Sequence, residues 1–363
     1  MKVLKNLSNR IPALLFGLLF VTCHAAAADS QKNFEIPAEV ARIPVALKEQ
    51  PPFVCTFESA RIPKRDPDAH NLFLHATRLY KKNIRTDEYK ETFRLYRIAA
   101  AWGHDKAARH LAHLLISNYR AAEDSPVKPI DIAEELIRNG MPGGYLLMSR
   151  LLEEGHGVKK DSKVSLQFLR FAADQGDPHA QFILGEKFYS LSLRYPFLDE
   201  IGLEMQRCAA DQGHTQAAYD IAERFQSEEK YSEALRYYQI AVQAKSNAEG
   251  HYLYSRLSAE QYAASELQRA FNDPDSDSSS YLGLVADKIR AARYNKINGI
   301  FKNDDYPIPP EGIINQIVPL PPAKLSAWDG KIEIVPPLPS EKRIREMARA
   351  KGLDPQTGLP VKK

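Results

Sequence analysis

The sequence lacks a large net charge, a long apolar run and a low-complexity composition. Its 363 residues are 44% hydrophobic and 26% charged, which excludes a collagen, a wholly disordered chain and a multi-span membrane protein. The formal net charge is +3, and leaving out Lys2, Lys5 and Arg10 leaves 46 basic side chains against 46 acidic ones. Because binding to nucleic acid depends on an excess of basic side chains, we expect no nucleic-acid partner.

The sequence also lacks the short motifs of several enzyme classes. It contains no Gly-x-Ser-x-Gly elbow, no P-loop and no Gly-x-Gly-x-x-Gly run, so serine-hydrolase and nucleotide-binding arrangements are missing. Acidic pairs such as Glu153-Glu154 are typical of the solvated face of a helix. His110-x-x-His113 places two imidazoles on one helix face, but without a third or fourth ligand nearby we interpret them as solvated polar positions. The sequence predicts no enzyme, no cofactor and no metal site.

Residues 1–28 have the three parts of a secretory signal peptide. A basic region with Lys2, Lys5 and Arg10 precedes the apolar run 11–21, and small side chains occupy 25–28. The apolar run is shorter than the roughly 20 residues that span a bilayer, which argues against an anchor helix. Lipidation at Cys23 is the other alternative, but the bulky Thr22 precedes that cysteine. We expect a cleaved leader and a periplasmic protein without membrane contact.

Cleavage would leave two cysteines, Cys55 and Cys208. A pair in an oxidising compartment is a candidate disulfide, and a bridge across 153 positions would strongly constrain the unfolded chain. The alternative is that Cys208 is an ordinary core side chain, because equivalent positions elsewhere hold isoleucine or phenylalanine. The sequence leaves both interpretations open.

A repeat of 36 to 37 residues organises the middle of the chain. Similar stretches surround Gly103, Gly140, Gly176 and Gly213, as in Phe171-AADQG and Cys208-AADQG. Constant spacing of this kind is typical of a helical repeat. The paired alanines before Gly103, Gly176 and Gly213 allow two helices to approach closely, and the glycine ends the helix where a positive φ is needed. One helix–turn–helix cannot bury its apolar face alone, so neighbouring units must stack into a solenoid.

The loop Leu152-x-x-Gly-x-Gly-Val-x-x-Asp161 joins the two helices of one unit. Gly155 and Gly157 form the turn, and Asp161 is positioned to cap the next helix. This loop, followed by Phe-Ala-Ala-Asp-Gln-Gly, resembles the Sel-one-like repeat (SLR), a relative of the tetratricopeptide repeat. The resemblance implies an all-α, right-handed α-solenoid of five to six helix–turn–helix repeats with Pro-rich extended caps.

These observations divide the chain into five parts. After the leader, 29–67 is predicted to be an extended N-terminal cap, because its prolines forbid long helices. The SLR solenoid covers 68–271 and begins with a helix capped by Asp68. A C-terminal helix from Tyr281 to Phe301 and a Pro-rich cap fill 272–339. The basic tail 340–363 is predicted to fray, apart from a short exposed helix between Arg343 and Lys351.

Solenoids of this type hold a peptide or a partner domain on their curved surface. Large aromatic side chains supply much of the contact energy at such interfaces. The candidate partner-binding residues are therefore aromatic or lie in exposed turns: Tyr145, His156, Phe182, Tyr189, Tyr219 and Tyr252.

The Cys-Ala-Ala-Asp-Gln-Gly unit and the terminal Ile317-VPLPPAK-Leu325 run, followed by Trp328-Asp-Gly, extend the resemblance. Together they are similar to a family of exported bacterial SLR proteins of unknown biochemical activity, often encoded beside antibacterial secretion-system effectors. That resemblance implies an immunity protein of a type VI secretion system, which binds and occludes a toxic effector such as a lipase or wall hydrolase. The alternative is an envelope scaffold or regulator that binds a protein of the producing cell.

Overall fold

The computed structural model describes residues 32–81, 86–117, 126–243, 259–274, 281–302, 312–332 and 336–361. In these ranges the protein is helical, and its β-structure is limited to one isolated bridge between Leu353 and Pro360. The predicted leader and its Cys23 lie outside the described residues. The helices are α1 (Ala38–Ala41), α2 (Pro67–Lys81), α3 (Thr86–Ala101), α4 (Asp105–Ile116), α5 (Pro129–Arg138), α6 (Pro142–Glu154), α7 (Ser162–Asp174), α8 (Pro178–Leu191), α9 (Phe197–Asp211), α10 (Thr215–Ser227), α11 (Tyr231–Val242), α12 (Ala259–Asn272), α13 (Lys288–Phe301), α14 (Ile313–Ile317) and α15 (Glu341–Ala350).

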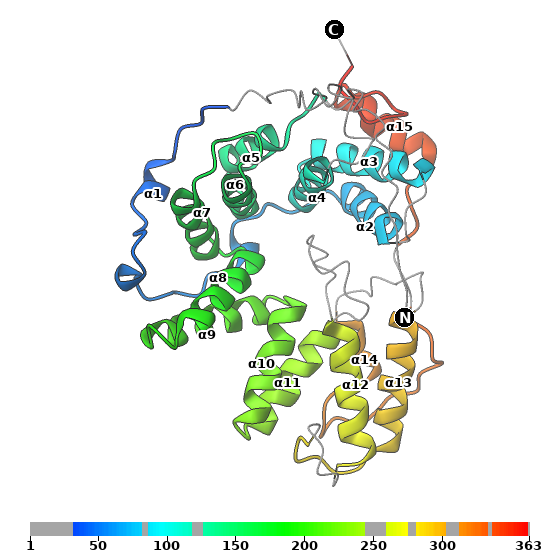
Figure 1. Ribbon diagram of the computed structural model, residues 1–363. Coiled ribbons are helices and arrows are strands. Elements are labelled where there is room, and N and C mark those ends of the chain that lie inside the picture. The colour runs from blue at the N-terminus through cyan, green and yellow to red at the C-terminus, as the bar shows by residue number, and fades with distance from the viewer. Residues whose placement is uncertain are drawn as a thin grey trace, which may run out of the picture.

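Helices α2 to α13 form six consecutive pairs, and each helix packs against its neighbours in the chain. The pairs stack along a curve, and the first and last pairs lie at the two ends of an open ring (Figure 1). Their buried side chains form two apolar clusters, one centred on α2 to α8 and one on α10 to α14. The all-α helical solenoid predicted from the sequence is confirmed.

Glycines and polar caps end and start the helices where the repeat predicts. Positive φ angles occur at Gly103, Gly140, Gly155, Gly157, Gly176 and Gly213. In the α6–α7 turn, Val158 is fully buried, and the Asp161 carboxylate accepts hydrogen bonds from the backbone N–H groups of Lys163 and Val164. These bonds satisfy two of the N–H groups that a helix start leaves without partners.

The N-terminal segment runs along the outer side of the ring, over the second helices of the pairs (Figure 1). Lys32 forms ion pairs with Asp131 and Glu134 on α5. Further on, the α7 side chain of Gln167 donates a hydrogen bond to the carbonyl oxygen of Ile43. The segment therefore lies lengthwise on the repeats, and its extended backbone obtains hydrogen bonds from helix side chains instead of from a sheet.

Cys55 and Cys208 form a disulfide that fixes this segment to α9. Cys208 is also buried, with 2% of its surface exposed, so the two interpretations that the sequence left open describe the same side chain. Next to the bridge, the backbone N–H of Glu58 donates to Gln212 Oε1 at 2.7 Å.

The C-terminal segment returns from the last pair to the first. Its first part packs on α11 and α13, where Gln239 Nε2 donates to the carbonyl oxygen of Val318 at 2.9 Å. Further along, the carbonyl oxygen of Pro336 lies 2.9 Å from His75 Nε2 on α2. Helix α15 then packs against α3, so this one segment contacts both ends of the ring (Figure 1).

The structure corrects the expectation that the basic tail frays. Helix α15 spans Glu341–Ala350, and its apolar face of Ile344, Met347 and Ala348 is buried. The indole Nε1 of Trp102 donates to the carbonyl oxygen of Met347, and Arg94 pairs with Glu341 at 2.7 Å. A charged helix with one apolar stripe is stable only against a partner surface, which α3 supplies.

Two further helix boundaries differ from the sequence prediction. The helix expected over Tyr281 to Phe301 begins at Lys288, because the Asp287 carboxylate caps it there, and it is the second helix of the sixth pair. At α2 the capping carboxylate belongs to Asp66, which accepts a hydrogen bond from the backbone N–H of Ala69, instead of to Asp68. Across the described ranges, every helix is too short or too polar to cross a membrane.

Candidate partner-binding groove

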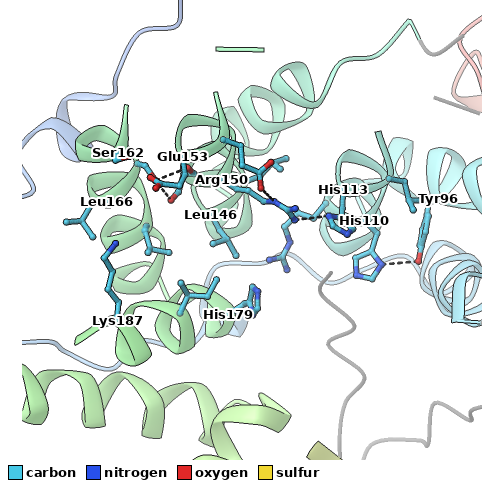
Figure 2. A pocket seen from close by; sticks show the side chains of 18 of the residues that line it. Tyr96, His110, His113, Leu146, Arg150, Glu153, Ser162, Leu166, His179 and Lys187 are labelled. Atoms are coloured by element: carbon cyan, nitrogen blue, oxygen red, sulfur yellow. Dashed lines mark hydrogen bonds and ion pairs between the residues drawn. The ribbon is translucent and has the colours of Figure 1, made fainter. Parts of the chain in front are cut away.

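A groove of roughly 320 Å³ opens along the first helices of the early pairs. Side chains of α2, α3, α4, α6, α7 and α8 line it, and we call it the inner groove (Figure 2). Aliphatic side chains, among them Leu114, Leu146, Leu166 and Ile183, form part of its walls. Its polar groups include His110, His113, Arg150 and Lys187. An apolar cleft with a few directed polar groups is the usual form of a binding site.

Arg150 joins two neighbouring helices in the groove (Figure 2). Its guanidinium lies 2.7 Å from Nδ1 of His113 on α4 and 2.8 Å from the carboxylate of Glu154, one turn further along α6. Because an arginine side chain only donates, Nδ1 of His113 must be the acceptor. The arginine is thus held in one orientation while part of it stays accessible to a partner.

His110 forms the buried end of a hydrogen-bond chain at one side of the groove (Figure 2). Its Nδ1 lies 2.9 Å from the hydroxyl of Tyr96, which lies 3.0 Å from the hydroxyl of Thr77. Thr77 donates to the carbonyl oxygen of Phe73. Burial, reinforced by the nearby positive charge of Arg109, holds the pKa of His110 well below its ordinary value, so the ring is neutral at pH 7. The expectation that His110 is a solvated polar side chain is therefore wrong, since it is packed into the core.

A buried ionic cluster borders the inner groove. Arg109 lies 2.9 Å from Asp177, and Asp177 also caps α8. Glu58, on the N-terminal segment, approaches the same guanidinium at 3.7 Å. Burial raises the pKa of Glu58 to about 7, although the charges of Lys106 and Arg109 oppose this shift. The cluster links the outer segment to the helices that shape the groove.

Two histidine pairs connect successive repeats. His104 and His214 cap α4 and α10, and in each case Nδ1 accepts from a helix N–H while Nε2 contacts the preceding repeat's histidine, His70 or His179. Because Nδ1 is an acceptor, Nε2 carries the proton and donates across the repeat boundary. His104 and His214 thus occupy the position just before their helices begin.

The predicted partner-binding residues are scattered over the molecule. Tyr145 and Phe182 are buried, with Tyr145 against Phe171 and Phe182 stacked on His214, so both are core residues. His156 is half-buried in the α6–α7 turn, and Tyr189 is 56% exposed beneath the guanidinium of Arg224. None of these four lines the inner groove.

Tyr219 is half-buried on α10, where its hydroxyl donates to Glu223 at 2.8 Å. It lies in a tyrosine- and acid-rich surface with Tyr262 and Asp220, and burial raises the pKa of Asp220 to about 7. Tyr252 lies outside the described residues.

The residues that line the groove were missed because they come from several different helices and form no sequence motif. The one available signal is the spacing of His110 and His113 on one helix face, which we interpreted from the sequence as two solvent-exposed side chains. Within the described ranges, no three histidine, cysteine or acidic side chains come together in a way that could hold a metal ion.

Comparison with known proteins gives one family model and several solved structures. A model described as a domain of unknown function (DUF6396) matches residues 263–361, which run from α12 through the returning segment to α15. Pseudomonas aeruginosa 5086 (PA5086) has 25% sequence identity and a TM-score of 0.50, covering 75% of this chain and 96% of that one. Immunity protein Pa5087 from Pseudomonas aeruginosa has 27% identity and a TM-score of 0.50, covering 70% and 90%. None of the curated proteins matches the sequence.

Proposed function

We propose that this protein is an immunity protein: a non-enzymatic, exported solenoid that binds a toxic antibacterial effector and blocks it. The observation that carries the proposal is the likeness to immunity protein Pa5087, which extends over 70% of this chain and 90% of that one. The inner groove supports it, because a curved helical surface with a lined cleft is suited to holding part of another protein.

The periplasm is the proposed place of action. The leader-like residues 1–28 direct the chain across the inner membrane, and the Cys55–Cys208 disulfide matches an oxidising compartment. The proposed effector reaches the periplasm through a type VI secretion system and attacks lipid or cell wall there. Occlusion requires a tight complex but no turnover, which agrees with a site built from aliphatic side chains and fixed ion pairs.

A competition experiment tests the proposal. The gene is deleted together with any neighbouring toxin gene, and the strain is mixed with its intact parent. We expect it to be killed, to survive beside a secretion-defective parent, and to be rescued by this gene alone. A form without residues 1–28 should fail to rescue, because the toxin acts in the periplasm. If the deletion strain survives equally well beside both parents, under conditions in which the secretion system is shown to be active, the immunity function is refuted. The alternative function, an envelope scaffold, then takes its place.

A further inference from the structure

The hydrogen-bond chain at the inner groove determines which nitrogen of His110 carries the proton. Thr77 has one hydroxyl proton and donates it to the carbonyl oxygen of Phe73, which can only accept. The contact between Thr77 and Tyr96 therefore uses the tyrosine proton. Tyr96 in turn can only accept from Nδ1 of His110. Nδ1 is thus protonated, and Nε2 of His110 has a free lone pair.

That lone pair is buried, and it belongs to a side chain that lines the inner groove. Within the described part of the chain, Nε2 of His110 has no hydrogen-bond partner. An unsatisfied buried acceptor destabilises the protein, and a ligand that donates a hydrogen bond to it recovers that energy. Six of the nineteen side chains that line the groove are aliphatic and two are tyrosines, so part of the bound group should be apolar.

Charge around the ring restricts the donor further. Arg109 and Lys106 both act on His110 with positive potential. The same potential disfavours a bound ammonium or guanidinium group. A neutral N–H or O–H donor on an apolar body has no such penalty. Among protein side chains, tryptophan and tyrosine combine these two properties.

We propose that the inner groove receives a tryptophan or tyrosine side chain of the protein partner, with its N–H or O–H donated to Nε2 of His110. The choice of a protein partner rests on the proposed function. The aromatic ring lies between Leu114, Leu146 and Ile183, and the buried acceptor selects for a donor at its edge. This gives the groove a preference that shape alone would not supply, because phenylalanine fits the walls but leaves the acceptor unsatisfied.

Four amide probes test the donor requirement directly on the mature full chain. N-acetyl-tryptophanamide and N-acetyl-tyrosinamide carry the donor, N-acetyl-phenylalaninamide lacks it, and N-acetyl-argininamide is cationic. Titrations up to the solubility limit are followed by the side-chain nitrogen signals of the histidines. We expect the first two to shift the Nε2 signal of His110 and to bind roughly three- to tenfold more tightly than the phenylalanine probe.

Two variants separate this site from nonspecific binding. His110→Phe should remove the preference for donor-bearing probes, and Leu146→Trp should fill the groove and abolish binding of all of them. Leu193→Trp, at a side chain that is 98% exposed in the turn between α8 and α9, is the matched control and should bind like wild type. Equal binding of the phenylalanine probe, a preference that survives in His110→Phe, or no binding at all would overturn the proposal.

The same variants distinguish failure of this site from failure of the proposed function. If wild type binds the toxin encoded beside its gene and protects against it, but Leu146→Trp does so equally well, the groove proposal fails and the immunity proposal stands. If wild type does not protect, the immunity proposal fails, and the probe titrations still decide what the groove accepts.

Discussion

Replacement of Gly176 by alanine is the sharpest test of how the outer segment is held. Gly176 has a φ of 101°, in the left-handed region that L-residues avoid. A Cβ added there would lie 2.7 Å from the backbone carbon of Phe57, 2.7 Å from the nitrogen of Glu58 and 3.0 Å from the oxygen of Thr56. Real Cβ atoms do not approach backbone so closely, and the nearby disulfide prevents the segment from moving away freely.

Two effects add at this position. The left-handed backbone costs about 1–2 kcal/mol for a residue with a Cβ. Displacing the packed segment costs about 1–3 kcal/mol more, as in other overpacked sites. We therefore expect Gly176→Ala to lower the free energy of unfolding by roughly 2–5 kcal/mol, and Gly176→Val to lower it at least as much.

Gly103 is the matched control, because it is the equivalent glycine of another repeat with a φ of 79° and no atom within 4 Å of an added Cβ. Gly103→Ala should show only the backbone cost, about 1–2 kcal/mol. The assay is urea unfolding of the mature protein, followed by circular dichroism. Equal losses in the two alanine variants would refute the reasoning that the segment crosses directly over Gly176.

Three further predictions concern the segments and the buried charge. Reduction of the Cys55–Cys208 bridge should lower the free energy of unfolding by about 3–5 kcal/mol, because the bridge closes a loop of about 150 residues. The measurement is a thermal melt with and without reductant, in which a Cys55→Ser/Cys208→Ser variant should be insensitive to the reductant. Met347→Ala should cost about 2–5 kcal/mol and make residues after 340 sensitive to limited proteolysis, whereas unchanged protection would contradict the docking of α15 on α3. The pKa of Glu58 is raised from 4.5 to about 7, so the folded state favours the protonated carboxyl group. The stability that Glu58 contributes is therefore fully present below pH 4.5 and is lost as the pH rises through 7. Glu58→Gln should therefore be more stable than wild type at pH 8, by on the order of 1–3 kcal/mol, with little difference at pH 4.5; the absence of any pH-dependent difference in urea unfolding would show that Glu58 is not desolvated.

The repeat body was largely predictable because its signals are local. A glycine that ends a helix and a carboxylate that caps the next one act within a few residues, so Gly176 and Asp161 could be identified by spacing alone. The groove was not predictable in the same way. Leu146 and Ile183 belong to different repeats, and only the stacking of α6 against its neighbours brings them to one surface.

The tail shows the same limit. Charged residues dominate 340–351, and the stripe of Ile344, Met347 and Ala348 is too short to predict a stable helix by itself. It is stabilised by α3, about 250 positions earlier in the sequence. Likewise, the choice of proton on His110 depends on Thr77 and Tyr96, which reach it from two other helices.

By itself, the sequence determined the helix–turn–helix repeat, its period and the expected exported compartment, because these depend on interactions between near neighbours and on segment composition. The tertiary structure alone decided that the N-terminal segment lies on the outer face, that the C-terminal segment contacts both ends of the ring, and that His110, beside the inner groove, keeps a buried nitrogen without a hydrogen-bond partner. These features depend on contacts between distant residues, whose geometry follows only from how the repeats stack.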